Sequence, residues 1–220
     1  MKLVQWRVHQ KSQDLDLPEA ILMPVFGAPK PGLAPEIAAL LPSVADPSGW
    51  TTDLTQNAAQ KRGLCAGIFL GNPLLQRRRI LGDLQASGLS WVCNLPSVCQ
   101  HDIDFITHLD EVDLGVENEL TNLADCAASG FRCIASVATP EDARTALRLG
   151  FRTLFVLPKI RAHEGGFPSE LSRTRAVAAI AEVPGLDDAV LLSQVKSSEI
   201  AAPVVWPAQV QAVVEQPLPV

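Results

Sequence analysis

The fold is decided by one short phrase, Gly88-Leu89-Ser90-Trp91-Val92-Cys93-Asn94-Leu95-Pro96. It predicts a glycine that ends a helix, a buried strand, and a proline that begins the next loop. Glycine adopts the left-handed backbone conformation at little cost, and proline fits the start of a loop or helix. The same order of residues recurs at 63–73, 130–140 and 150–158. Its strands are nearly continuous apolar runs, which is typical of a parallel sheet covered on both faces.

Helices are expected between these phrases. Leu74–Ser87 has leucines and isoleucine at helical spacing, with arginines for the solvent side. Thr139-Pro140-Glu141-Asp142 predicts a helix start, because threonine caps, proline fits the first turn and acidic side chains favour the positive end of a helix. Other strands are expected at Leu3–Val8, Ala20–Phe26, Asp188–Ser193 and Ala202–Trp206, and other helices at Leu33–Leu41, Arg173–Ala181 and Ala208–Val214.

This alternation of strands and helices predicts an α/β fold in a single domain that spans residues 1–220. Seven or eight such units favour a TIM (β/α)8-like barrel. We expect it to be compact, with short or incomplete units, because the chain is shorter than the roughly 250 residues typical of that fold. An open doubly wound sheet is the alternative architecture, but no GxGxxG motif follows the first predicted strand.

Composition excludes several classes of protein. The chain has 220 residues and a formal net charge of −6, which argues against a dedicated nucleic-acid binder. No apolar run approaches the roughly 20 residues that a membrane helix needs, and polar residues interrupt the first ten residues where a signal peptide would be apolar. We therefore expect a cytoplasmic protein with neither a nucleic-acid nor a membrane partner. The five cysteines form no CxxC pair, so free thiols are expected.

Candidate binding residues follow from where parallel barrels place their chemistry, at the carboxyl ends of the strands. The polar side chains predicted there are Asn72, Asn94, Ser97, Ser136, Arg161 and Ser193. They are the candidate substrate-binding residues. Both asparagines could equally be turn residues beside proline, because asparagine side chains satisfy nearby backbone groups.

Three further residues are candidate catalytic groups. Lys159 directly follows a predicted strand, where its ammonium group could stabilise negative charge that develops on a substrate. His163 lies beside a predicted strand end and is a candidate general base. Glu117 is the carboxylate favoured from the acidic segment 100–119. That segment has side chains that suit a divalent cation, but its spacing matches no EF-hand or HExxH motif. No metal ligand is assigned, and Mg²⁺ remains an open cofactor.

Taken in order, these motifs resemble the phosphoenolpyruvate hydrolase-like TIM-barrel family, also called TIM-barrel signal transduction proteins. The likeness extends from Leu64 to about Pro158. Ala66-Gly67-Ile68 with Asn72-Pro73-Leu74 is similar to one step of that family, and Gly88–Val98 is similar to its most specific step. The resemblance implies a barrel related to the phosphoenolpyruvate/pyruvate superfamily, whose members commonly use a divalent metal on an enolate or oxoacid.

The chain also departs from that family. Asn72 stands where the family has aspartate, Ser193-Gln194-Val195 replaces a His-Gly-Gly turn, and Trp206-Pro207-Ala208 replaces a phosphate loop. Two functions therefore stay open. The first is a hydrolase or lyase that acts on a small phosphorylated or oxoacid substrate, with Asn94 and Ser97 orienting it. The second is a non-catalytic ligand-binding or signalling barrel that has lost the phosphate loop. Both imply a small anionic partner, and a homo-oligomer is left open.

Overall fold

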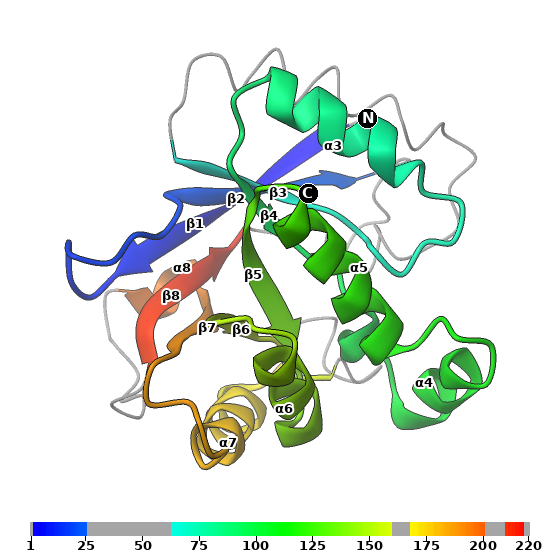
Figure 1. Ribbon diagram of the computed structural model, residues 1–220. Helices are drawn as coiled ribbons and strands as arrows, with labels where there is room; N and C mark the ends of the chain where they lie inside the picture. Colours follow the sequence, from blue (N-terminus) through cyan, green and yellow to red (C-terminus); the bar gives the residue numbers. More distant parts are fainter. Residues whose placement is uncertain (1, 26–62, 160–167, 201–209, 218–220) are drawn as a thin grey trace.

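The protein forms a closed barrel of eight strands that follow one another around the barrel in chain order (Figure 1). A computed structural model describes residues 2–25, 63–159, 168–200 and 210–217. The strands are β1 (Lys2–Gln10), β2 (Ala20–Val25), β3 (Leu64–Gly67), β4 (Trp91–Cys93), β5 (Arg132–Val137), β6 (Thr153–Val156), β7 (Val190–Lys196) and β8 (Val210–Gln216). Within these ranges, no helix is long and apolar enough to cross a membrane.

Strand direction corrects the expected fold. The neighbours from β2 to β8 are parallel, but β1 runs antiparallel to both β2 and β8. The barrel is therefore mixed, and the prediction of a TIM (β/α)8-like barrel is wrong. The physical reason lies in residues 11–19, which alone join β1 to β2. A parallel return needs a crossover of a dozen or more residues, so a link this short brings the chain back antiparallel.

The last strand is a second correction. The sequence predicted a helix over Ala208–Val214, whereas the described part of that segment belongs to β8, Val210–Gln216. Side chains along β8 alternate between buried and half-buried positions, as the two faces of a strand require. Several of them are β-branched valines, which pack well on a pleated sheet. The predicted helix Leu33–Leu41 and strand Ala202–Trp206 lie outside the described residues.

The repeated phrase is confirmed in its geometry. Its four glycines have positive φ angles, 94° at Gly63, 77° at Gly88, 94° at Gly130 and 93° at Gly150. Each is followed by one of the strands β3 to β6, and these strands pair in parallel with one another. The sequence thus predicted the central part of the barrel correctly and failed where the first and last strands close it.

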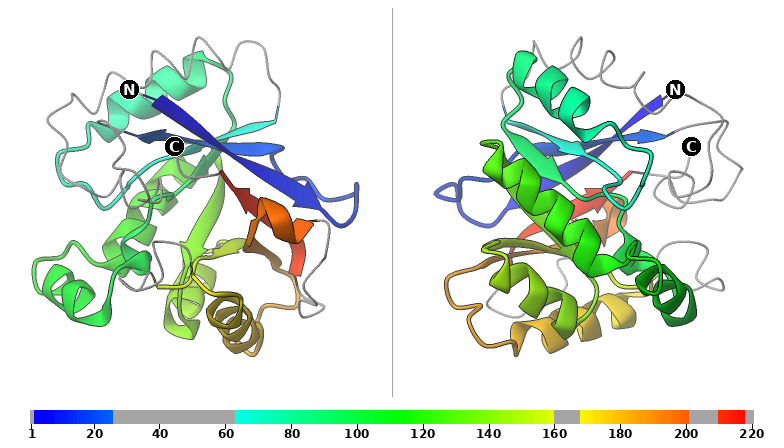
Figure 2. Two further views of the ribbon diagram at one scale, coloured as in Figure 1. Left: turned by 180° about the vertical axis from the view of Figure 1, so that it is seen from behind. Right: turned by 45° about the vertical axis from the view of Figure 1, so that its right-hand side comes forward.

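Helices cover the outside of the barrel, as the views in Figures 1 and 2 show. They are α3 (Arg77–Ala86), α4 (Ile103–Asp110), α5 (Val116–Ala128), α6 (Pro140–Arg148), α7 (Glu170–Ala181) and α8 (Ser197–Ile200), with a 3-10 turn η1 (Val98–Gln100) before α4. The predicted helices at 74–87 and 173–181 correspond to α3 and α7. The predicted start of α6 is confirmed, with Thr139 at the N-cap and Pro140 in the first turn.

Aromatic side chains fill the inside of the barrel. Trp6 on β1 meets Phe155 on β6 edge to face, with ring centroids 6.3 Å apart. These strands are not neighbours in the barrel, so both rings project into its interior. The other side of the wall is sealed by apolar helix residues that are fully buried, namely Leu84, Leu120, Leu123, Val177 and Ile180. The barrel thus has a packed interior and a packed outer layer, and a site must form at its rim.

Candidate functional site

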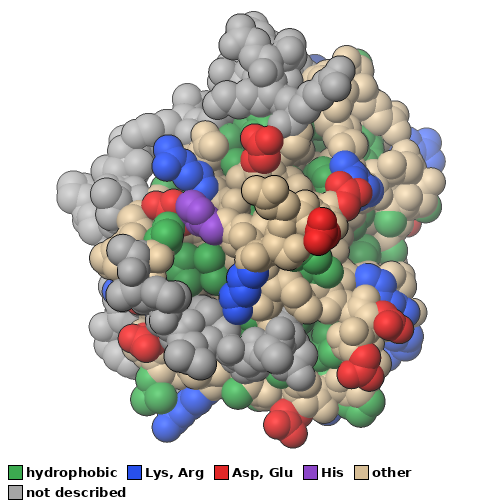
Figure 3. All heavy atoms as spheres, turned by 90° about the vertical axis from the view of Figure 1, so that its left-hand side faces the viewer, with side chains coloured by type: hydrophobic (Ala, Val, Ile, Leu, Met, Phe, Trp, Pro, Cys, Tyr) green, Lys and Arg blue, Asp and Glu red, His purple; other side chains and the backbone are tan. Residues whose placement is uncertain are grey.

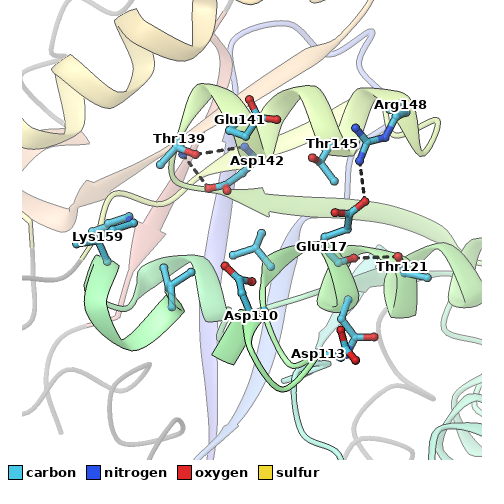
Figure 4. Close-up of a pocket in the computed structure, with 15 residues that line it drawn as sticks. Asp110, Asp113, Glu117, Thr121, Thr139, Glu141, Asp142, Thr145, Arg148 and Lys159 are labelled. Atoms are coloured by element: carbon cyan, nitrogen blue, oxygen red, sulfur yellow. Dashed lines mark hydrogen bonds and ion pairs between the residues drawn. The ribbon is translucent and has the colours of Figure 1, made fainter. Parts of the chain in front are cut away.

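A groove of about 770 Å³ lies at the carboxyl side of β5 and β6, between α4, α5 and α6 (Figure 4). Apolar and charged side chains share its lining. The residues that line it are Ile103, Ile106, Asp110, Asp113, Gly115, Val116, Glu117, Asn118, Thr121, Thr139, Glu141, Asp142, Thr145, Arg148 and Lys159. The loops that follow the parallel strands β5 and β6 lie at this end of the barrel, so the position fits a binding site.

The first wall of the groove comes from α4. Ile103, Ile106 and Asp110 lie three and four residues apart, so they share one helical face, and all three line the groove. The helix begins at Asp102, whose side chain accepts a hydrogen bond of 2.9 Å from the backbone N–H of Phe105. These apolar side chains would contact the less polar part of a bound molecule.

The turn from α4 to α5 brings acidic groups to the rim. Asp113 adopts a left-handed backbone conformation, with φ of 56°. A Cβ atom on Gly115 would lie 1.5 Å from Oδ1 of Asp110, so a side chain at that position would displace the Asp110 carboxylate. This close approach holds Asp110 against the start of α5. Asp110 and Asp113 come seven and four residues before Glu117, and all three line the groove.

The opposite wall is the capped start of α6. Oγ1 of Thr139 accepts a hydrogen bond from the N–H of Asp142, and Oδ2 of Asp142 accepts from the N–H groups of Ala138 and Thr139, both at 2.9 Å. Burial raises the pKa of the Asp142 carboxyl above its ordinary value, and these hydrogen bonds offset part of the increase. Asp142 is occupied as a cap, so it is not available as a free general base.

The charges of the groove are unevenly paired. Glu117 forms an ion pair of 2.8 Å with Arg148, and Glu141 forms one of 2.7 Å with Arg144. The carboxylates of Asp110 and Asp113 have neither a hydrogen bond nor an ion pair within the described ranges. The same holds for the ammonium group of Lys159, which is half-buried. Five carboxylates line the groove against two cationic side chains, so its potential is negative.

A second polar cluster lies beneath the surface and reaches no solvent. Glu119 on α5 is 0% exposed, and its carboxylate accepts hydrogen bonds from Nδ2 of Asn94 at 3.0 Å, from the Ser97 hydroxyl and from the N–H of Val98. Oδ1 of Asn94 accepts from the N–H of Ser136 at 2.7 Å. Burial raises the pKa of Glu119 to about 7, although the hydrogen bonds from Ser97 and Asn94 oppose that increase. The cluster joins the end of β4 to β5 and α5.

The remaining predicted site residues are dispersed. Oδ1 of Asn72 accepts a hydrogen bond of 2.9 Å from the N–H of Leu74, which is a turn contact. The Ser136 hydroxyl lies 3.6 Å from the thiol of Cys93 inside the protein. Ser193 is 1% exposed, and its hydroxyl has no partner within the described chain. Arg161 and His163 lie outside the described residues. Of the predicted residues, the structure brings Glu117 and Lys159 to the groove.

The sequence did not single out Glu119. It favoured Glu117 as the carboxylate at the barrel mouth; Glu117 lines the groove, whereas Glu119 on the same helix is fully buried. The helical period could have indicated that Glu119 is buried. Val116, Leu120 and Leu123 form the buried stripe of α5, and Glu119 lies on the same side of the helix. The groove residues Asp110 and Asp113 were not selected, because they belong to a charge run and such runs are usually solvated. Glu141 and Asp142 were assigned to a helix start, and Arg148 was not considered.

Metal ligands and reactive thiols are not grouped in the described chain. Within it, no group of three or more histidine, cysteine, aspartate or glutamate side chains is arranged to hold a metal ion. Its cysteines are free thiols, and burial raises the pKa of Cys93 to about 12, so its thiolate is scarce at neutral pH. The face in Figure 3 intersperses acidic and basic side chains and shows no continuous basic patch.

Comparisons with known proteins add one relative. No family model matches the chain. An uncharacterized protein of Sinorhizobium fredii, y4oT, is 28% identical to it over 99 residues, which cover 45% of this chain and 50% of y4oT. The chain therefore spans about half the length of this relative. The similarity assigns no activity, so the function is argued from the groove.

Proposed function

We propose that this protein is a ligand-binding barrel without turnover, and that its groove binds a molecule that carries a positively charged group. The carboxylates of Asp110 and Asp113 carry the proposal, because they lie at the rim of the groove without partners in the described chain. The side chains predicted to bind or transform a substrate already bond to other residues of the protein. Asn94 and Ser97 are sealed with Glu119, and Glu117 is paired with Arg148.

Electrostatics favour a cation over the small anion that the sequence suggested. A bound anion would have to approach several carboxylates in a concave site, where low-dielectric walls strengthen repulsion. A cation would gain attraction from the same groups, and the match of opposite potentials raises both association rate and specificity. The apolar side chains of Ile103 and Ile106 would cover the less polar part of the ligand.

An NMR titration of the ¹⁵N-labelled protein tests this function with agmatine as the cationic probe and phosphoenolpyruvate as the anionic one. We expect agmatine to shift the amide signals of Asp110, Asp113 and Glu117, and phosphoenolpyruvate to leave them in place. The affinity for agmatine, obtained from these shifts, should fall by about tenfold or more in the double variant Asp110→Asn, Asp113→Asn. A tenfold loss corresponds to about 1.4 kcal/mol. The exposed Asp187→Asn removes an acidic charge outside the groove and serves as control.

A second candidate function is a phosphoenolpyruvate hydrolase-like enzyme, and Lys159 is the observation that favours it. Its side chain lines one end of the groove just after β6, where a cation could stabilise an enolate or oxoacid (Figure 4). That reading expects phosphoenolpyruvate or oxalate, with Mg²⁺, to shift the Lys159 amide and to lose affinity in Lys159→Met. If phosphoenolpyruvate or oxalate shifts the Lys159 amide and agmatine shifts no groove amide, the enzyme function replaces the cation-binding function.

A further inference from the structure

We infer that the ligand of the groove is a segment of another protein, in which a large apolar side chain is flanked by lysine or arginine. This inference rests on the proposed binding function and names the chemistry of its partner. The observation behind it is that exposed apolar side chains lie inside the groove and directly beside it. Ile103 lines the groove and is 63% exposed.

Exposed apolar side chains lie on α4 and directly after it. Val112, next to the groove residue Asp113, is 61% exposed, and Phe105, on the side of α4 away from Ile103, is 45% exposed. Figure 1 shows α4 at the edge of the molecule, away from the barrel strands. Exposed apolar residues that gather beside a groove mark an interaction surface more often than isolated ones do. A small molecule in the groove would leave Val112 uncovered, whereas an extended partner would cover it.

Charge complementarity selects the kind of partner. No lysine or arginine occurs between residues 80 and 131, the stretch that carries α4 and α5. Acidic side chains surround the apolar surface, with Asp110 and Asp113 on the groove side and Asp104 on the exposed part of α4. A basic segment would be steered to this face, and its apolar anchor would pack against Ile103, Ile106 and Val116. An acidic segment would be repelled by the same groups.

Selection of short random peptides displayed on phage, with the full chain as bait, tests the inference. We expect the enriched peptides to carry a net positive charge and at least one large apolar residue. Affinity of a selected synthetic peptide, measured by fluorescence anisotropy, should fall by about tenfold in Ile103→Ser and in Asp110→Asn. It should stay unchanged in Leu171→Ser, which removes an apolar side chain that is 59% exposed on α7, and in Asp187→Asn.

Each outcome decides the point. Peptides that are acidic or lack an apolar anchor, or no enrichment at all, would overturn the inference. A selected peptide that responds to Asp110→Asn but not to Ile103→Ser would show that the groove binds a cation alone. In that case, or where agmatine shifts the groove amides and no peptide is enriched, the binding function stands without the peptide partner. Failure of both probes would overturn both proposals.

Discussion

Glu119 is a carboxyl group held where no solvent reaches it, at the junction of β4, β5 and α5. Desolvation disfavours its charged form, so its pKa rises to about 7 against hydrogen bonds that favour the carboxylate. An unfolded glutamate has a pKa of about 4.3, so the folded protein holds a proton that the unfolded chain releases. This residue therefore links folding stability to pH.

Its stability contribution has a definite sign. Because the folded pKa is raised, the contribution is fully present below the unfolded pKa and is lost as pH increases through about 7. We expect the free energy of unfolding, measured in urea, to decrease between pH 5 and 8, by at most about 1.4 kcal/mol per pH unit from this group. Glu119→Gln should flatten that part of the profile, while the exposed Glu117→Gln on the same helix should keep it. An unchanged profile in Glu119→Gln would contradict the assignment.

Asn94 shows how one residue type takes two roles in this chain. It is fully buried, and Asn94→Ala would leave the Ser136 N–H without its acceptor and remove a donor from Glu119. We expect this variant to lose on the order of 2–4 kcal/mol of unfolding free energy, because unsatisfied buried groups are costly. Asn72→Ala is the matched control, since it removes one turn contact at a half-buried position and should cost about 1 kcal/mol or less. Thermal melts of both variants measure the loss of stability, and equal losses would refute the expected difference between Asn94 and Asn72.

Among the elements, α6 has the start that local sequence predicts best. Thr139 caps it and Asp142 completes a reciprocal capping box. Thr139→Ala should lower the unfolding free energy by about 1 kcal/mol, because one N–H of the first turn loses its acceptor. Thr121 is an exposed position within α5. Thr121→Ala should change the unfolding free energy by no more than a few tenths of a kcal/mol, since alanine is the better helix former. Urea melts at one pH measure both, and a Thr139→Ala melt that matches wild type would argue against the cap.

Elements whose signal is local could be predicted, and those that depend on distant partners could not. The positive-φ glycines, the buried strands β3 to β6 and the cap of α6 follow from neighbouring residues. Along β8, the apolar residues were mistaken for a helix, because a short apolar run fits both periods until a partner strand is known. The groove was missed for a related reason. Asp110 and Glu141 are far apart in sequence, and only packing of α4, α5 and α6 brings them together.

At the scale of the whole molecule, the barrel closes through its first and last strands. β8 pairs in parallel with β7 and antiparallel with β1, with Arg7 opposite Glu215. Val210, Ala212 and Val214 of β8 are at most 1% exposed. Nothing in the local pattern of either strand specifies which distant strand it will pair with. The short link 11–19 was the one available sign that β1 runs against β2.

This closure makes β8 essential for a single cooperative structure. A chain that ends at residue 209 would lose β8, so β7 and β1 would become open edges with unpaired backbone groups. Trp6 would lose part of its enclosure, since β1 would keep β2 as its sole neighbour. We expect this variant to lose its cooperative thermal transition and to shift its tryptophan emission to longer wavelength, whereas a chain that ends after Pro217 and keeps β8 should melt as the full chain does. A cooperative melt of the shorter chain within a few degrees of the full chain would mean that seven strands fold without closure. The groove between α4, α5 and α6, which does not touch β8, could then be studied in the smaller barrel.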